Sequence, residues 1–357
     1  MEAKIEIAKL LFQQNKYQEA INTCNEILAT YNHSIEALKL IAKSFLATRK
    51  IDDALLYFNR ALNINPDDFE LIKDLGNTYQ AIGDIHTAKK YYQKALTINS
   101  NYAPALTNLG MLELNTSNKQ GALSLLIKAT KSAPQLAPVW GNLANGYFQL
   151  GKTKEAEIAY RKAIELNPHH FKYHFHLGII LFGQNKLQEA EKSFRTTIKL
   201  KPDLVEAHIN LGSVLKELGD LKEAEISTRK AIELDPYLFE AFSNLGSILK
   251  DVGKLKEAEI TIRKAIKLKP DLAKAHINLG SVLREIGDLK EAEISTRKAI
   301  KLKPDIVQAY INLGEILIQL GKNKEALLCF EKTLELRDWS LKGLYGLTYT
   351  CEMESSS

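Results

Sequence analysis

The sequence predicts an all-α protein built as a solenoid of stacked helical hairpins. The chain of 357 residues repeats itself every 34 residues, without insertion or deletion, from its first residue to about residue 340. Residues 205–238 and 273–306 are identical at 26 of 34 positions. Two amphipathic stretches in a period of this length indicate a helix-turn-helix unit that buries its apolar faces against its neighbours. Function is therefore expected on an extended surface.

The repeats are expected to form one array over residues 1–340, because no linker interrupts the period. Ten repeats begin at residues 1, 35, 69, 103, 137, 171, 205, 239, 273 and 307. Residues 341–357 follow the last repeat, and their apolar spacing predicts a closing helix and tail, with the helix from about Leu341 to Met353.

The first helix of each repeat carries a small residue that lets a second helix approach closely. The Leu211-Gly212 pair is one example. A glycine such as Gly219 then ends this helix, because it adopts positive φ without strain. Asn15 and Asn185 are tolerable at that position, whereas Arg49 and Ser117 depart from the pattern.

The second helix has a start signal, a stop signal and a small residue on its inward face. Asp220 and Glu223 have the spacing of a capping box, and Pro236 prevents the helix from continuing. An alanine stands at one phase of every repeat, where it permits close packing. These residues are Ala20, Ala54, Ala88, Ala122, Ala156, Ala190, Ala224, Ala258, Ala292 and Ala326.

This pattern resembles the tetratricopeptide repeat, and the match covers all ten repeats. The fifth repeat carries it most completely, with Trp140, Leu143, Ala144, Tyr147, Gly151, Ala156, Tyr160, Ala163 and Pro168. The array is also similar to the repeat region of O-linked N-acetylglucosamine transferases and to tetratricopeptide arrays of marine cyanobacteria. The resemblance implies a right-handed superhelix whose concave surface is lined by the first helix of each repeat.

Composition and charge exclude several classes of function. Positive residues exceed negative ones by five, and Glu and Arg recur four residues apart on the second helices, as in Glu225 and Arg229. Such a face is solvated, so we expect no nucleic-acid partner. No segment approaches the ~20 apolar residues that cross a membrane. Cys24, Cys329 and Cys351 have neither disulfide nor zinc spacing, which suits a reducing, cytoplasmic location.

The sequence predicts neither an enzyme nor a bound cofactor. It contains no phosphate-binding glycine loop and no nucleophile elbow. His169, His170, His174 and His176 could suggest a metal site. However, His174 shares its repeat phase with two other histidines, His208 and His276, and with Trp140, Phe242 and Tyr310, so we interpret it as a packing residue and expect no metal.

A row of asparagines immediately precedes the Leu-Gly phase. It comprises Asn108, Asn142, Asn210, Asn244, Asn278 and Asn312. Amide groups on the concave surface can bind a peptide backbone whatever its side chains. The resemblance to O-linked N-acetylglucosamine transferases implies this use. The alternative is that each amide forms a hydrogen bond to the neighbouring repeat.

The asparagine row is interrupted at His176, where nearby concave positions become apolar. The apolar residues are Phe148, Phe175, Ile179 and Phe182, and all but Phe175 occupy phases that carry Lys, Arg or Ser in the seventh, eighth and ninth repeats. We predict an apolar anchor for a polypeptide ligand. The alternative is additional packing between repeats.

The C-terminal segment is more apolar than one buried helix face requires. Trp339, Tyr345 and Tyr349 are the predicted excess, and an exposed aromatic stripe favours contact with a second copy, giving a homodimer, or with a domain that once followed.

Together these observations predict a non-catalytic scaffold that binds an extended protein or peptide segment in its concave groove. Two alternatives remain. The chain could be the substrate-recruiting region of a transferase whose catalytic domain is absent, or it could be an assembly factor for a large protein complex.

Overall fold

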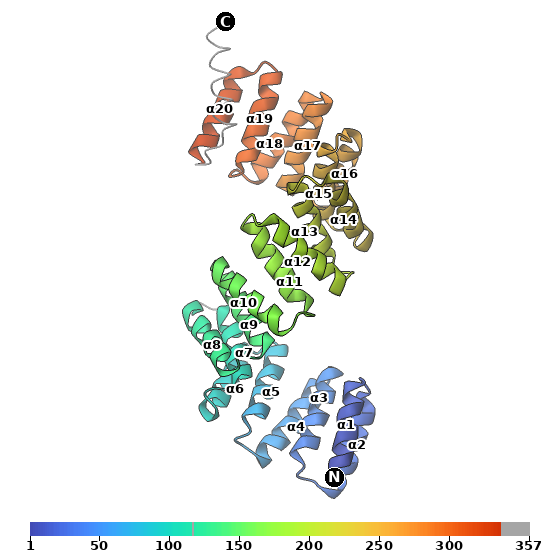
Figure 1. The fold of residues 1–357 in the computed structure, drawn as a ribbon, viewed down its shortest axis with the longest axis vertical. Helices are drawn as coiled ribbons and strands as arrows, with labels where there is room; N and C mark the ends of the chain where they lie inside the picture. The colour runs from blue at the N-terminus through green and yellow to red at the C-terminus, as the bar shows by residue number, and fades with distance from the viewer. Residues whose placement is uncertain (116–117, 337–357) are drawn as a thin grey trace. The chain divides into compact units, whose positions relative to one another are not determined.

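The computed structural model describes residues 1–115 and 118–336, and this part of the chain contains twenty α-helices and no strand. Figure 1 shows them as consecutive hairpins. The odd-numbered helices are α1 (Glu2–Gln13), α3 (Ile35–Ala47), α5 (Phe69–Ala81), α7 (Ala103–Leu114), α9 (Ala137–Gln149), α11 (Phe171–Gly183), α13 (Val205–Glu217), α15 (Phe239–Asp251), α17 (Ala273–Ile286) and α19 (Val307–Gln319).

The even-numbered helices complete the repeats. They are α2 (Tyr17–Thr30), α4 (Ile51–Ile64), α6 (Ile85–Ile98), α8 (Lys119–Ser132), α10 (Thr153–Leu166), α12 (Leu187–Leu200), α14 (Leu221–Leu234), α16 (Leu255–Leu268), α18 (Leu289–Leu302) and α20 (Asn323–Glu335). The predicted all-α solenoid of about ten helix-turn-helix repeats is therefore confirmed.

The chain divides into two compact bodies, with the boundary between Tyr173 and His174, inside α11. We call them the N-terminal body and the C-terminal body. The predicted closing helix and tail, residues 341–357, lie outside the described residues.

Small residues bring the two helices of each repeat together, as the sequence predicts. All ten alanines at the repeated phase of the even-numbered helices are 0 % exposed. On the odd-numbered helices, Gly246 lies so close to Ile262 that a Cβ atom would be 2.2 Å from Ile262 Cγ1. Only glycine fits this approach without displacing its neighbour.

The turns between paired helices use the left-handed conformation. Gly219 has φ 84°, and Asn15 and Asn185 have φ 62° and 61°, in agreement with their predicted role. Arg49 also has φ 60°. The turn geometry is thus retained at Arg49, although a non-glycine residue in this conformation costs about 1–2 kcal/mol. Ser117 lies outside the described residues.

Hydrogen bonds at the helix starts agree in part with the predicted capping boxes. Asp220 Oδ1 accepts from Glu223 N at 3.2 Å, and Asp288 does the same for Glu291 N. The Glu223 carboxylate binds Arg195 of the preceding repeat. This half of the capping box is therefore used to connect repeats.

Within residues 1–115 and 118–336, no helix is long and apolar enough to span a bilayer.

Candidate peptide-binding surfaces

In the C-terminal body, the asparagine row lies on the odd-numbered helices and joins adjacent repeats. Asn244 Nδ2 donates to Ser213 Oγ at 3.3 Å, and Asn244 Oδ1 accepts from Lys274 Nζ at 3.2 Å. Asn278 Nδ2 donates to the Ser243 carbonyl oxygen at 3.3 Å. These amides make the bonds that the alternative interpretation expects. They are nevertheless only half-buried, so part of each residue is accessible to solvent.

The ends of the asparagine row differ from its middle. Asn312 is only 6 % exposed, and its Oδ1 accepts from Gln308 Nε2 at 2.7 Å. Asn210 is half-buried and has no side-chain hydrogen bond to another described residue. Asn210 therefore offers a free amide to a ligand, whereas Asn312 is part of the packing.

Basic side chains on the same helices also bridge repeats. Lys216 Nζ donates to Ser247 Oγ at 2.7 Å and lies 3.1 Å from Asp251 Oδ2. One repeat later, Lys250 lies 3.4 Å from Ser281 Oγ and 3.6 Å from Glu285. These pairs are half-exposed, so each contributes little stability but fixes the side-chain direction. Charged and amide groups thus alternate along this face.

In the N-terminal body, the two predicted asparagines are also bonded. Asn108 Nδ2 donates to Asn77 Oδ1 at 2.7 Å, and the Tyr92 hydroxyl lies 2.8 Å from the same oxygen. Burial raises the pKa of Tyr92 to about 12, so this hydroxyl stays protonated. Asn142 Nδ2 instead donates to the Pro138 carbonyl of its own helix at 2.9 Å.

The first two odd-numbered helices enclose a hollow of about 340 Å³. Phe12 and Leu40 give it apolar walls, and Lys39 and Lys43 lie at its side. Both lysines are paired with carboxylates of α5 or its cap, and Lys39 Nζ lies 3.0 Å from Asp68 Oδ2. This hollow can accept an apolar side chain.

Asp68 allows a pH-dependent test of this region, because it caps α5 and also binds Lys39. Burial alone would raise its pKa, but the bonds from Leu71 N and Lys39 outweigh burial, and the pKa lies below its usual value. A lowered folded pKa gives stability above the unfolded value of about 3.9, which is lost as the pH falls through the folded pKa.

We therefore expect Asp68→Asn to destabilise the N-terminal body at pH 7 by about 0.5–1 kcal/mol, because it keeps a cap but loses the ion pair. The difference from wild type should vanish below the folded pKa. Hydrogen exchange of α5 at pH 7 and at a pH below the folded pKa measures this difference in stability. The exposed neighbour Asp67 provides the control substitution Asp67→Asn. Equal effects of the two substitutions would contradict the assignment.

The predicted apolar anchor is divided between the two bodies. Phe148 belongs to the N-terminal body and is 38 % exposed. Phe175, Ile179 and Phe182 belong to the C-terminal body and are half-buried on α11. The Phe175 ring meets the buried Phe194 ring edge-on at 6.0 Å, so part of its surface serves packing. His176 lies beside Phe175, with ring centroids 5.5 Å apart. The anchor stays a prediction.

The recurring histidines occupy a structural position. His208 Nε2 lies 2.9 Å from the Pro202 carbonyl oxygen, and His276 Nε2 lies 3.0 Å from that of Pro270. Trp140 and Tyr310 make the corresponding bond to the proline carbonyl six residues before them. This shared bond supports the interpretation that the residue at this repeat phase has a structural role. Among the described residues, no three His, Cys, Asp or Glu side chains are grouped so that they could hold a metal ion.

The two cysteines that the structure describes have environments suited to packing. Cys24 is buried and Cys329 is half-buried, and burial raises the pKa of both thiols to about 11. Neither is activated as a nucleophile. Cys351 and the predicted self-association residues Trp339, Tyr345 and Tyr349 lie outside the described residues.

The even-numbered helices carry a second continuous set of charges. Arg229 binds Glu225 of its own helix at 2.8 Å, as the four-residue spacing predicts, and it also binds Glu257 of the next repeat at 2.6 Å. Arg263 and Arg297 repeat both contacts. The pairing within one helix follows from the sequence pattern, whereas the bonds between repeats were not predicted. A search for opposite charges 28 residues apart would have found them.

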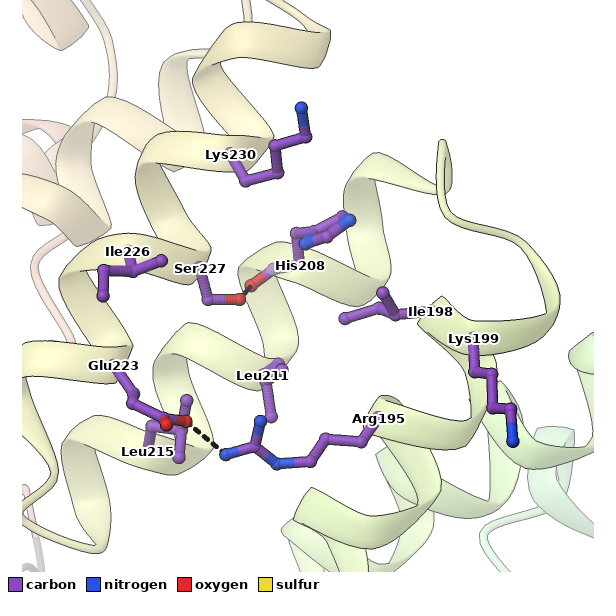
Figure 2. Close-up of a pocket in the computed structure, with 10 residues that line it drawn as sticks. All are labelled: Arg195, Ile198, Lys199, His208, Leu211, Leu215, Glu223, Ile226, Ser227 and Lys230. Atoms are coloured by element: carbon purple, nitrogen blue, oxygen red, sulfur yellow. Dashed lines mark hydrogen bonds and ion pairs between the residues drawn. The ribbon is translucent and has the colours of Figure 1, made fainter.

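The Arg195–Glu223 ion pair borders a hollow in the C-terminal body. Figure 2 shows it beside α12, α13 and α14, with Ile198 and Ile226 on opposite sides of His208 and the Arg195–Glu223 pair at one end. Its volume is about 540 Å³. A second hollow of about 480 Å³ has the equivalent lining from α18, α19 and α20, including Ile300, Tyr310 and Leu328.

Paired helices of nearly constant length, joined by left-handed turns at a fixed period, define a helical-repeat protein. The chain belongs to the tetratricopeptide repeat family, whose models match residues 2–69 and 74–102. Residues 136–340, more than half of the chain, match the repeat model described as the Cilia and flagella-associated protein 70 C-terminal domain. No curated protein matches the chain.

Several crystal structures are similar in fold. The APC/C hetero-tetramer Cut9-Hcn1 contains a chain with a TM-score of 0.56 at 13 % identity, covering 97 % of this chain and 89 % of that one. Yeast Tom70 has a TM-score of 0.47 at 16 % identity, covering 99 % and 95 %. YrrB, described as a TPR protein with an unusual peptide-binding site, has a TM-score of 0.44 at 25 % identity, covering 52 % and 95 %.

Proposed function

We propose that the chain is a non-catalytic protein-interaction scaffold that binds an extended polypeptide along its odd-numbered helices. The observation that carries this proposal is the regular row of half-exposed polar groups on α13, α15 and α17. The free amide of Asn210 is followed by the Asn244 and Asn278 amides, whose bonds of 3.3 Å are longer than the usual 2.9–3.0 Å. A ligand backbone could replace such bonds at little cost.

The spacing of these groups also suits a polypeptide better than a small molecule. They recur once per repeat, so a ligand that uses several of them must extend over several helices. The basic groups between them, Lys216 and Lys250, are held in place by carboxylates of the next repeat. The row therefore offers hydrogen bonds without a large net charge, which suits recognition of a backbone.

The proposal predicts a graded loss of affinity. The probe is a partner segment that is captured by cross-linking and then made as a synthetic peptide. If the three rings form the anchor, the triple variant Phe148→Ala, Phe175→Ala, Phe182→Ala should bind this peptide about thirtyfold more weakly than wild type. Asn210→Ala, Asn244→Ala or Asn278→Ala should each cost about 1 kcal/mol, or roughly fivefold. Isothermal titration measures both effects.

Two controls separate binding from folding. Asn312→Ala changes the same residue type at a buried position and should alter stability rather than affinity. Circular dichroism shows whether the triple phenylalanine variant keeps its helices. Full affinity in every asparagine variant, or cross-links confined to even-numbered helices, would contradict binding along this face.

A further inference from the structure

In the C-terminal body, the outer surfaces of four successive even-numbered helices carry one exposed aliphatic side chain each, at the phase that holds Leu56 and Ile158 in the N-terminal body. Ile226, Ile260, Ile294 and Leu328 lie on α14, α16, α18 and α20, and they are 59, 70, 69 and 64 % exposed. Single exposed apolar residues are common in proteins. Here, however, four such residues stand at one position of successive even-numbered helices, and they form a row. Ion pairs connect these helices to one another. We call it the outer aliphatic row.

Lysines flank every member of this row, four residues before and four residues after it. Lys256 and Lys264 stand on either side of Ile260, and Lys290 and Lys298 flank Ile294. Residues four apart share one face of a helix, so each aliphatic residue stands between two lysines on that face. The same holds for Ile226, between Lys222 and Lys230, and for Leu328, between Lys324 and Lys332.

Most of these lysines lack a countercharge. Lys230 and Lys332 bind a glutamate of their own helix. The other six, Lys222, Lys256, Lys264, Lys290, Lys298 and Lys324, form no ion pair with another described residue, although Lys264 Nζ lies over the Phe242 ring, 4.2 Å from its centroid. The nearby carboxylates of Glu257, Glu291 and Glu325 are already bound to arginines. The row therefore has a positive potential that the fold itself does not neutralise.

The hollows beside the row are shaped for side chains. Ile226 lies at the wall of the first hollow and Leu328 at the wall of the second, and leucines such as Leu211 and Leu313 line their inner parts. An arginine–glutamate pair closes one end of each. A side chain on a polypeptide can enter such a recess beneath the ion pairs, whereas the plane of a lipid bilayer cannot follow it.

We propose that the outer aliphatic row and its lysines form a second binding surface, for an acidic polypeptide segment that inserts apolar side chains into the hollows between even-numbered helices. This surface is distinct from the asparagine row that carries the proposed function, although α13 and α19 also line the hollows. Either surface could operate without the other. The required partner chemistry is an alternation of carboxylates, for the unpaired lysines, with leucine-like side chains, for the hollows.

The test uses the full chain and a fluorescein-labelled synthetic peptide in which leucines recur among glutamates and serines. We expect the fluorescence anisotropy to show saturable binding that weakens with salt. Ile260→Ser, Ile294→Ser protein should bind about tenfold more weakly, and Lys264→Glu, Lys298→Glu protein about a hundredfold more weakly. All four positions are exposed, so these variants are expected to fold.

A matched control makes the same charge change at the same phase elsewhere. Lys94→Glu, Lys128→Glu alters α6 and α8, where Lys90 and Ser124 replace the aliphatic residue. Its affinity should stay within about twofold of wild type. An equal loss in the control, or undiminished binding of a peptide whose leucines are replaced by serine, would overturn the proposal in favour of unspecific charge attraction.

Two further outcomes decide against the proposal. Binding to phosphatidylserine vesicles without binding to the peptide would assign the row to a membrane surface. Loss of peptide binding in Asn210→Ala, Asn244→Ala protein, with the outer variants unaffected, would place the probe on the odd-numbered helices. That last result would leave the proposed function standing. Conversely, asparagine variants that keep full affinity for the cross-linked partner would contradict only the proposed function and leave the outer surface standing.

Discussion

Replacing Phe58 by alanine is expected to lower the free energy of unfolding of the N-terminal body by about 3–5 kcal/mol. Phe58 on α4 is 0 % exposed and packs in a cluster with Leu38, Leu71 and Leu75 of the flanking helices. The substitution removes a full aromatic ring from the contact between two repeats. Since a solenoid lacks a central core, the cavity cannot be filled from elsewhere.

The loss should also be local. Because a repeat interacts chiefly with its nearest neighbours, hydrogen exchange should accelerate in α3, α4 and α5, while α14, α16 and α18 keep their wild-type rates. Exchange measured by mass spectrometry on both bodies gives the comparison. Acceleration throughout the chain would instead show that the array unfolds as one cooperative unit.

The same helix offers a matched control. Leu56 lies two residues from Phe58 but is 57 % exposed. Leu56→Ala should change stability by no more than about 0.5 kcal/mol. Similar losses for Leu56→Ala and Phe58→Ala would mean that helix propensity, rather than packing, determines the stability of α4.

The sequence predicts the fold well because the signals within a repeat are local. The helix starts at Ile35, Phe69 and Val205 coincide with the predicted repeat starts. Small residues, turn residues and caps each act within a few positions along the chain. At Arg49 the local signal was absent, yet the turn formed, because the packing of α3 against α4 imposes it.

The candidate surfaces were less predictable, because they depend on contacts between repeats. The asparagine row is visible in the sequence. The sequence does not show that Asn312 is buried or that Asn210 has a free amide. To predict a bond such as that from Asn244 to Ser213, one must know how far adjacent helices are displaced. The outer aliphatic row was in principle visible as Ile260 and Ile294 at one phase, but only the structure shows that they are exposed.

The glycines of the odd-numbered helices lead to the second large expected effect. Gly246→Ala should destabilise the C-terminal body by about 1–3 kcal/mol, although alanine is the better helix former. The new Cβ atom would lie 2.2 Å from Ile262 Cγ1 and 2.9 Å from its Cδ1. Ile262 is 0 % exposed and lies within the hydrophobic core of these repeats, so moving it disturbs other buried side chains. Chemical denaturation with hydrogen exchange of α15 and α16 measures the loss.

Gly183, the last residue of α11, provides the control, because a Cβ atom there would meet no heavy atom within 4 Å. Gly183→Ala should be neutral or stabilise by up to about 1 kcal/mol. Ile262→Ala should partly compensate Gly246→Ala, because it removes the atoms that the new methyl group would strike. The double variant should therefore be less destabilised than the sum of the two single variants. Strict additivity would show that Gly246 is required for its backbone freedom rather than for its size.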